Sequence, residues 1–290
     1  MFFTKMHGLG NNYILFNQLD ASTHPSLELE YHELAKRVSD VHFGIGSDGI
    51  ILICPSEIAH VKMRIFNKDG SEAKNCGNGL RCVARYVFDH RYITYNHFTI
   101  ETLSGVVSVE VKVDEKKEVQ SIVINMGKPK LLKGLIPMRG DALETAINER
   151  YTIGKKNYFL TCLSMGNPHA VLFVENHEEI CLEEIGPIIE HDSLFPERVN
   201  ISVVQIKNKK EIIYRVWERG SQITMACGTG ACASVVAATL NHLLEMHQPI
   251  LVHLQGGDLL ITWDELGDVW MQGEASYICQ GMLDESFLEQ

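Results

Sequence analysis

Two short segments of the chain combine a cysteine with a glycine-rich turn. They read NCGNG at residues 75–79 and ACGTG at residues 226–230, and each precedes an apolar stretch of helical length. The unpaired N–H groups and the dipole at a helix N-terminus stabilise a thiolate, so a lowered pKa is predicted for Cys76 and Cys227. Two such cysteines, about half a chain apart, can act on one carbon atom from opposite sides.

The chemistry that needs this arrangement is the inversion of an amino-acid stereocentre. A base must remove the α-proton from one face while an acid delivers a proton to the other. Pyridoxal enzymes use their cofactor as an electron sink, but the sequence contains no Walker loop to hold a phosphate. Glycines beside each cysteine would let backbone N–H groups approach the substrate carboxylate. The two segments therefore predict a racemase or epimerase that uses no cofactor.

A simpler interpretation is that both cysteines are small, buried, hydrophobic residues, as cysteines often are. The repetition of C-G-x-G before two helices favours the catalytic interpretation. Cys82 and Cys232 lie six and five residues further along, on another face of each helix, and are predicted to belong to the core. The sequence has no C-x-x-C and no H-x-x-x-H pair, so neither a thiol-redox motif nor a metal site is predicted.

The composition is that of an ordinary soluble globular protein, with 290 residues, 45% hydrophobic and 22% charged. The net charge of −11 argues against nucleic acid as a partner, because phosphate binding needs a basic excess. The first residues lack a basic flank followed by an apolar region, and no apolar run reaches the roughly 20 residues that span a bilayer. A cytoplasmic protein with no membrane partner is therefore expected.

Strand signals dominate both halves of the chain. Runs rich in β-branched and aromatic residues, bounded by Gly, Asn or Asp, predict strands at 2–6, 13–17, 49–54, 61–67, 98–102, 106–113, 121–125, 158–164, 170–174, 199–206, 212–217, 250–254, 258–263 and 269–273. Hairpin turns are predicted at 103–105 and 255–257.

Helices are predicted at 27–39, 80–90 and 231–244. The last of these is apolar on nearly every face up to Asn241, so it must be buried on all sides. A buried helix among many antiparallel strands indicates a sheet curled around it. The order of strands, cysteine motif, helix and strands recurs, which predicts two similar α+β halves with a boundary near 127–129.

Seven motifs, in order along the whole chain, resemble those of the diaminopimelate epimerase family. They lie at 7–11 (HGLGN), 64–71 (RIFNKDGS), 76–79 (CGNG), 164–169 (SMGNPH), 198–201 (RVNI), 218–220 (ERG) and 226–230 (ACGTG). The resemblance implies a pyridoxal-independent epimerase that converts LL- to meso-diaminopimelate. It also implies two pseudo-symmetric halves, each a mostly antiparallel, barrel-like sheet around a central helix, with the active site between them. The halves would be 1–127 with 276–290, carrying Cys76, and 128–275, carrying Cys227.

The resemblance also implies roles for individual residues. Cys76 and Cys227 resemble the family's acid–base pair. The backbone cradle of the reacting carboxylate would be formed by Gly77, Asn78, Gly228 and Thr229. Asn67, Asn200 and Arg219 resemble the binders of the distal amino-acid end, while Asn11, Asn167 and Glu218 line the family's pocket. His169 and Glu218 are expected to support the cysteines as neighbouring titratable groups. No cofactor is implied; the partner is an amino-acid substrate, and family members are often dimers, although the sequence leaves the oligomeric state open.

Two positions depart from the family pattern. Asn12 stands where an aspartate is usual, and Gly49 stands where many bacterial members have glutamine. Asp48 is expected to be a structural turn residue. Two other functions are weighed against the epimerase: a related two-cysteine racemase for histidine, lysine or proline, against which Arg219 argues, and a relative that has lost a thiol, against which both cysteines argue.

Overall fold

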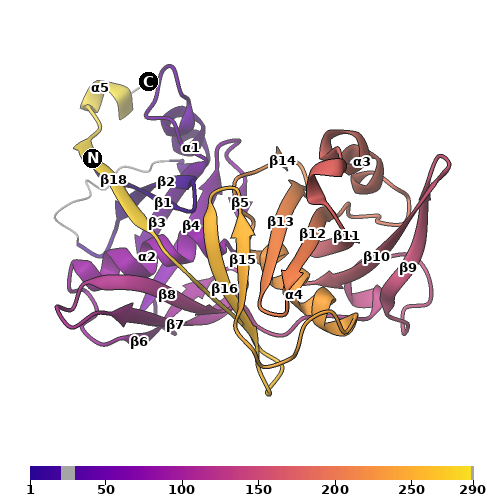
Figure 1. Ribbon diagram of the computed structural model, residues 1–290. Helices are drawn as coiled ribbons and strands as arrows, with labels where there is room; N and C mark the ends of the chain where they lie inside the picture. Colours follow the sequence, from indigo (N-terminus) through magenta and orange to yellow (C-terminus); the bar gives the residue numbers. More distant parts are fainter. Residues whose placement is uncertain (21–29, 289–290) are drawn as a thin grey trace. The chain divides into compact units, whose positions relative to one another are not determined.

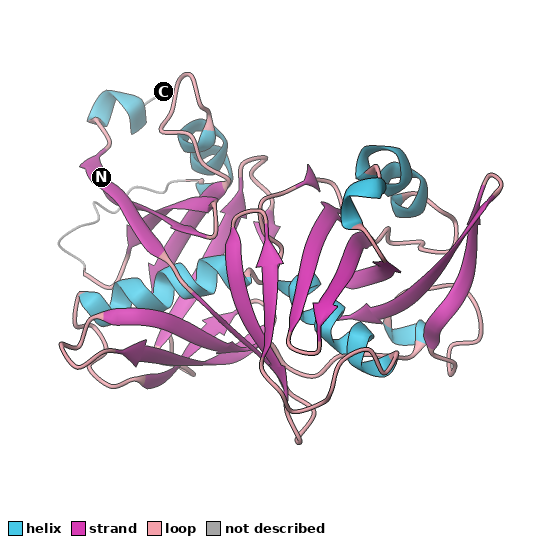
Figure 2. Cartoon of the chain, in the orientation of Figure 1, coloured by secondary structure: helices cyan, strands magenta, loops and turns pink. Residues whose placement is uncertain are grey.

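The computed structural model describes residues 1–20 and 30–288, and the chain divides into two compact units. Unit 1 comprises residues 1–124 and 273–290, and unit 2 comprises residues 125–272. Strands make up most of each unit, with a few helices, as Figures 1 and 2 show. Among the described residues, no helix is both long enough and apolar enough to cross a membrane.

The strands of unit 1 form a sheet in the order β18-β1-β2-β3-β4-β6-β7-β8. Its pairs β2–β3 and β4–β6 are parallel, and the other neighbours in this order are antiparallel. The two-residue strand β5 adds to β4. The bounds are β1 (Phe2–Gly8), β2 (Asn11–Asn17), β3 (Gly49–Cys54), β4 (Val61–Asn67), β5 (Glu72–Ala73), β6 (His97–Thr102), β7 (Gly105–Val113), β8 (Val119–Asn125) and β18 (Ser276–Met282).

The strands of unit 2 follow the order β9-β10-β11-β12-β13-β15-β16-β17, with β11–β12 and β13–β15 parallel and the other neighbours antiparallel. The two-residue strand β14 adds to β13. The bounds are β9 (Ala146–Ile153), β10 (Lys156–Ser164), β11 (Pro168–Val174), β12 (Asn200–Asn208), β13 (Glu211–Glu218), β14 (Gln222–Ile223), β15 (Ile250–Leu254), β16 (Gly257–Trp263) and β17 (Val269–Gly273).

The two units share one topology. The sequence of parallel and antiparallel pairings is the same from β18 to β8 as from β9 to β17, and each unit inserts its helices at the same places. A helix precedes the fourth strand of each order, at α1 (Tyr31–Ser39) and α3 (Leu182–Glu190), and another follows the short added strand, at α2 (Gly77–Asp89) and α4 (Gly228–Leu240). This confirms the prediction of an α+β fold with two pseudo-symmetric halves.

The helices α2 and α4 lie against many strands of their own units. The α4 helix is buried on nearly every residue and contacts β10, β11, β12, β13 and β16. One helix can touch so many strands only if the sheet curls around it, as its uniformly apolar sequence predicts. The α2 helix contacts β1, β2, β4 and β7 in the same way. Each helix therefore passes through the core of its unit, and its N-terminus is fixed by the surrounding sheet.

Several predicted boundaries need correction. The helix predicted at 231–244 ends at Leu240, because the Asn241 side chain turns back to the Ala237 carbonyl (2.8 Å) and to Thr161 Oγ1 (2.8 Å). Of the helix predicted at 27–39, residues 27–29 lie outside the described part of the chain, and α1 begins at Tyr31.

Some elements were not predicted at all. The α3 helix was missed because Gly186-Pro187 lies inside it, a dipeptide typical of a break. The strands β5, β9 and β14 were also missed, as were the short helices at Lys133–Leu135, His177–Glu179 and Glu285–Leu288. The strand β18 pairs with β1, in agreement with the C-terminal strand that the family resemblance places with the first half. The predicted hairpin turns join β6 to β7 and β15 to β16, as expected.

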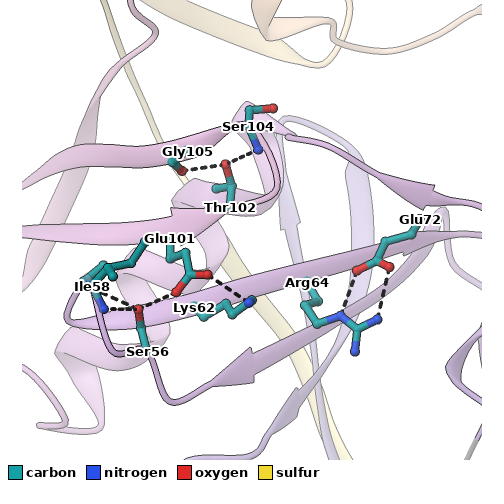
Figure 3. Close-up of polar contacts among 10 residues, drawn as sticks. Ser56, Ile58, Lys62, Arg64, Glu72, Glu101, Thr102, Ser104 and Gly105 are labelled. Atoms are coloured by element: carbon teal, nitrogen blue, oxygen red, sulfur yellow. Dashed lines mark hydrogen bonds and ion pairs between the residues drawn. The ribbon is translucent and has the colours of Figure 1, made fainter.

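Ion pairs brace the strand that leads to the first candidate site (Figure 3). Arg64 on β4 donates to both carboxylate oxygens of Glu72 on β5, at 2.7 and 3.0 Å. Lys62 on β4 pairs with Glu101 on β6 at 2.8 Å, and Glu101 also accepts a hydrogen bond from Ser56. These pairs tie β4 to β5 and to β6, so side-chain contacts as well as the backbone hold β5 against β4.

Candidate active site

Cys76 lies at the N-cap of α2, as the motif predicts. Its backbone is extended (φ −154°, ψ 112°), and its half-buried Sγ accepts a hydrogen bond from the Gly79 N–H at 3.4 Å. The Asn75 side chain accepts from the Cys76 N–H at 2.8 Å. Gly77 and Asn78 are the first helical residues. The thiol therefore stands in front of N–H groups that have no partner within the helix.

Two residues that the sequence did not suggest surround this thiol. The hydroxyl of Tyr13, on β2, lies 3.2 Å from Cys76 Sγ. Arg81, one turn along α2, is fully buried, and its charge opposes the rise in the pKa of Cys76 that burial causes. Arg81 stands between the apolar residues Leu80 and Cys82 of α2, which is the one sequence signal of its burial. Nothing in the sequence indicates the contact of Tyr13.

Asn11 and Asn78 are joined to this cluster. The Asn78 side chain donates to Asn11 Oδ1 at 3.1 Å and accepts from the Arg81 guanidinium at 2.7 Å. Arg81 also donates to the Glu274 carbonyl at 3.0 Å. The first turn of α2 is thus fixed both to β2 and to the chain just before β18.

Asn67 lies at the end of β4, in the tight turn toward β5. Its side chain donates to Ser71 Oγ at 3.0 Å, and its backbone N–H bonds to the Ser71 carbonyl at 2.9 Å. The side chain therefore stabilises its own turn. Asp48 also acts as the expected structural residue, because its carboxylate accepts from the Asn12 N–H at 2.8 Å.

Cys227 occupies the equivalent N-cap of α4, with extended backbone (φ −117°, ψ 104°) and 5% of its surface exposed. Gly228 and Thr229 are the first residues of the helix, and Thr229 Oγ1 lies 3.5 Å from Cys227 Sγ. Glu218 at the end of β13 is also hydrogen-bonded to the thiol and accepts from the Thr224 hydroxyl. Glu218 therefore lies beside Cys227, and its role as a support for this thiol stays a prediction.

The prediction of lowered thiol pKa values is wrong for this state of the protein. Burial raises the pKa of Cys76 despite the opposing effects of Tyr13 and the N–H groups of Gly79 and Asn78. Burial also raises the pKa of Cys227, and the nearby Glu218 carboxylate raises it further. The helix N-terminus was correctly recognised. However, moving a thiolate from water into the protein costs more free energy than hydrogen bonds from these N–H groups restore. The two thiols also differ, because a cation adjoins one and an anion the other.

A turn held by buried groups carries Arg219. Its backbone N–H donates to Asn200 Oδ1 at 2.9 Å, and the next N–H, of Gly220, donates to the buried carboxylate of Glu190 at 3.0 Å. Glu190 also accepts from the Trp217 indole at 2.7 Å. The exposed Arg219 guanidinium donates to the Glu197 carbonyl at 2.7 Å. Glu190 was missed because it lies in the unpredicted α3 helix.

His169 is fully buried on β11, with Nε2 3.0 Å from Asn167 Oδ1. Burial and, to a lesser degree, Arg219 lower its pKa to about 3. His169 is therefore neutral near pH 7, which corrects the expectation that it titrates beside the cysteines. Asn200 is its neighbour in the parallel β11–β12 register and bonds to the Pro168 carbonyl at 2.9 Å.

The burial of neutral His169 predicts sensitivity to acid. The pKa in the folded protein is below the unfolded value, so this contribution to stability is complete above about pH 6.5 and is lost as the pH falls toward 3. The expected loss is about 1.4 kcal/mol per pH unit within this window. Thermal unfolding of the wild type and of His169→Gln between pH 7 and pH 4 measures it. An equal decline in both proteins would contradict the assignment.

The last glycine of each cysteine motif, Gly79 or Gly230, is required by close packing around it. A Cβ at Gly230 would lie 2.0 Å from the buried Tyr214 hydroxyl, and one at Gly79 would lie 2.9 Å from Ile51 Cδ1. The sequence argument explained these glycines only by close approach to a substrate. In each unit the last glycine also lets the first helical turn pack closely on the sheet.

Most of the predicted residues form one connected group in each unit. In unit 1, Asn11, Asn78 and Cys76 lie together, while Asn67 belongs to its own turn. In unit 2, the group contains Asn167, His169, Asn200, Glu218, Arg219, Cys227 and Thr229. Cys82 and Cys232 are fully buried, which confirms that they belong to the core. Within the described residues, no three His, Cys, Asp or Glu side chains are arranged to hold a metal ion.

Two solved structures share this fold at low sequence identity. A Bacillus anthracis protein of the phenazine biosynthesis PhzF family matches with a TM-score of 0.68 and 17% identity, covering 97% of this chain and 98% of that one. A probable proline racemase from Agrobacterium radiobacter matches with a TM-score of 0.69 and 11% identity, covering 98% and 93%. At such identities the likeness concerns the fold alone.

Sequence relatives are much closer. Diaminopimelate epimerase from Bacillus cytotoxicus is 52% identical over 282 residues, which is 97% of this chain and 96% of the relative. The enzyme of that name from Bacillus anthracis is 51% identical over the same lengths. The model of the diaminopimelate epimerase family matches residues 3–132 and 161–278. With an equivalent N-cap cysteine in each half, this chain belongs to the diaminopimelate epimerase family.

Proposed function

We propose that this protein converts LL-diaminopimelate to meso-diaminopimelate without a cofactor, in the synthesis of lysine and peptidoglycan precursors. The observation that carries the proposal is family membership over nearly the whole chain, with a cysteine at the N-cap of the same helix in each unit. A cytoplasmic location accompanies the biosynthetic role. The proposed functional halves are 1–127 with 276–290, and 128–275.

The proposed reaction moves one proton off the α-carbon and another onto it. One cysteine, as a thiolate, removes the α-proton, and the electron pair of the broken C–H bond delocalises into the carboxylate. The other cysteine, as a thiol, protonates the opposite face and becomes a thiolate. Each turnover therefore exchanges the protonation states of Cys76 and Cys227, and turnover in the reverse direction restores them.

The N-termini of α2 and α4 suit the binding of the reacting carboxylate. We assign this role to the backbone of Gly77 and Asn78 in unit 1, and of Gly228 and Thr229 in unit 2. These are the first helical residues, whose N–H groups have no intrahelical acceptor. Such donors stabilise the negative charge as it develops on the carboxylate.

The distal amino-acid end needs a group that recognises a second carboxylate. We assign its binding to Asn67, Asn200 and Arg219, with Asn11, Asn167 and Glu218 lining the pocket. The support is chemical: the Arg219 fork can bind a carboxylate through two parallel hydrogen bonds, and its turn is held in place by Asn200 and Glu190. A substrate without this second carboxylate has no use for such a cation.

Proton NMR in D₂O tests the function directly. With LL-diaminopimelate and the reduced protein, we expect loss of the α-proton signal and appearance of the meso isomer. Proline, lysine and histidine, which lack the distal amino-acid end, serve as controls and should keep their α-proton signals. Exchange with one of these and not with diaminopimelate would transfer the assignment to a related racemase.

A further inference from the structure

Tyr13 occupies in unit 1 the place that His169 occupies in unit 2. Tyr13 lies on β2, three residues after Gly10 (φ 89°), and His169 lies on β11, three residues after Gly166 (φ 95°). Both glycines have positive φ and stand in the hairpin turn that leads into the strand. Each of the two aromatic residues follows the same Gly-Asn-x sequence. Each also pairs across the first hairpin, Tyr13 with Met6 and His169 with Leu163. The two-fold repeat thus places a polar aromatic side chain at the same point of both sheets.

The environment of Tyr13 differs from that of His169 in one respect that bears on chemistry. The Tyr13 side chain is 5% exposed, and its hydroxyl lies 3.2 Å from Cys76 Sγ, within hydrogen-bond distance for sulfur. His169 instead has its Nε2 on Asn167. Each N-cap thiol therefore has a phenol near it, Tyr13 in unit 1 and Tyr214 in unit 2, but only Cys227 also has a carboxylate, that of Glu218, beside it.

A phenol is suited to a group that must be both thiol and thiolate in turn. Its O–H donates to a thiolate, and its oxygen accepts from an S–H, so rotation about one C–O bond serves both states. Burial and the neighbouring Cys76 raise the pKa of Tyr13 well above its ordinary value, so the phenol keeps its proton while the thiol ionises. The Gly79 N–H donates to the same sulfur at 3.4 Å.

We propose that Tyr13 is a positioning residue for Cys76. The Tyr13 O–H stabilises and orients the Cys76 thiolate that acts as base. This rests on the proposed function in so far as Cys76 is one of the two proton-transfer groups. Tyr13 acts through the sulfur and exchanges no proton with the substrate. In unit 2 the place equivalent to Tyr13 is taken by His169, and the phenol near Cys227, that of Tyr214, comes from β13 instead. The two thiols are therefore tuned by groups from different strands.

The test follows the ionisation of each thiol separately. Alkylation by iodoacetamide is measured between pH 6 and pH 11 on the full chain, and the modified Cys76 and Cys227 peptides are quantified by mass spectrometry. In Tyr13→Phe we expect the Cys76 profile to move about one pH unit higher, because a hydrogen bond to a charged group is lost. The Cys227 profile should not move. An unmoved Cys76 profile, or a move to lower pH, would overturn the proposal.

Two further variants separate this role from a structural one. Tyr86→Phe removes another buried hydroxyl of unit 1, from a ring stacked on His90 at 4.0 Å, and should leave both profiles unchanged. Replacement of Tyr13 by 3,5-difluorotyrosine keeps the hydroxyl and makes it a stronger donor, so the Cys76 profile should move to lower pH. A shift to higher pH there would count against the proposal even if Tyr13→Phe does not fold.

Activity separates this inference from the proposed function. The acid limb of kcat/KM for diaminopimelate should move to higher pH in Tyr13→Phe, in parallel with the alkylation profile. Wild-type epimerisation with no change in either profile would overturn the role of Tyr13 and leave the function standing. A shifted Cys76 profile in a protein that epimerises no diaminopimelate would overturn the function and support the contact.

Discussion

Replacing either Cys76 or Cys227 with alanine is expected to lower epimerisation of diaminopimelate by at least about 10³-fold, because each variant lacks one of the two proton-transfer groups. The remaining thiol can still remove a proton from the face it reaches and return a deuteron to that face. Each variant should therefore show slow deuterium incorporation without inversion, into one isomer for Cys76→Ala and into the other for Cys227→Ala. Proton NMR in D₂O, started from each pure isomer, measures both quantities.

Two cysteines of the same helices provide matched controls. Cys82 and Cys232 are fully buried and lie one to two turns beyond the N-cap cysteines. Cys82→Ala and Cys232→Ala should retain turnover within a few-fold of wild type, with only a modest loss of stability from the smaller side chain. Inversion at near wild-type rates by either N-cap variant would refute the two-thiol mechanism.

Arg81→Met is expected to lower the stability of unit 1 by about 2–5 kcal/mol. The fully buried Arg81 side chain bonds to the Glu274 carbonyl and to the buried Asn78 Oδ1, and methionine removes this donor from both acceptors. Each acceptor that is left unpaired costs about 1–3 kcal/mol. Urea unfolding followed by far-UV circular dichroism measures the loss, which should appear as an earlier transition because the chain has two compact units.

The neighbouring Arg85 is the comparison for this effect. It lies one turn along α2 and bonds to the Ala275 carbonyl at 2.6 Å, but its side chain is partly exposed and also pairs with Asp89. In Arg85→Met, water can replace the lost donor, so the loss should stay below about 1 kcal/mol. Equal losses for the two variants would show that burial of Arg81 does not stabilise the unit.

Much of the fold followed from local patterns. Alternating and β-branched runs located most long strands, because a half-buried strand requires that pattern whatever its neighbours are. The uniformly apolar helix at 231–244 could only be buried, which required a curled sheet around it. The repeated C-G-x-G motif identified both helix N-termini, since cysteine and glycine at a cap act through the backbone beside them. The α3 helix was missed because its burial against Trp217 outweighs the helix-breaking tendency of Gly186-Pro187.

The sequence by itself therefore determined the two halves, the two helix N-termini and the thiols placed on them. The tertiary structure alone decided what surrounds those thiols. Tyr13 is 63 residues from Cys76 along the chain and reaches it only through the packing of β2 on α2. Burial, which depends on the whole sheet, raises the thiol pKa values that the helix N-termini would otherwise lower. Capping acts within one turn of chain and can be recognised in a sequence, whereas desolvation and long-range contacts depend on the entire fold.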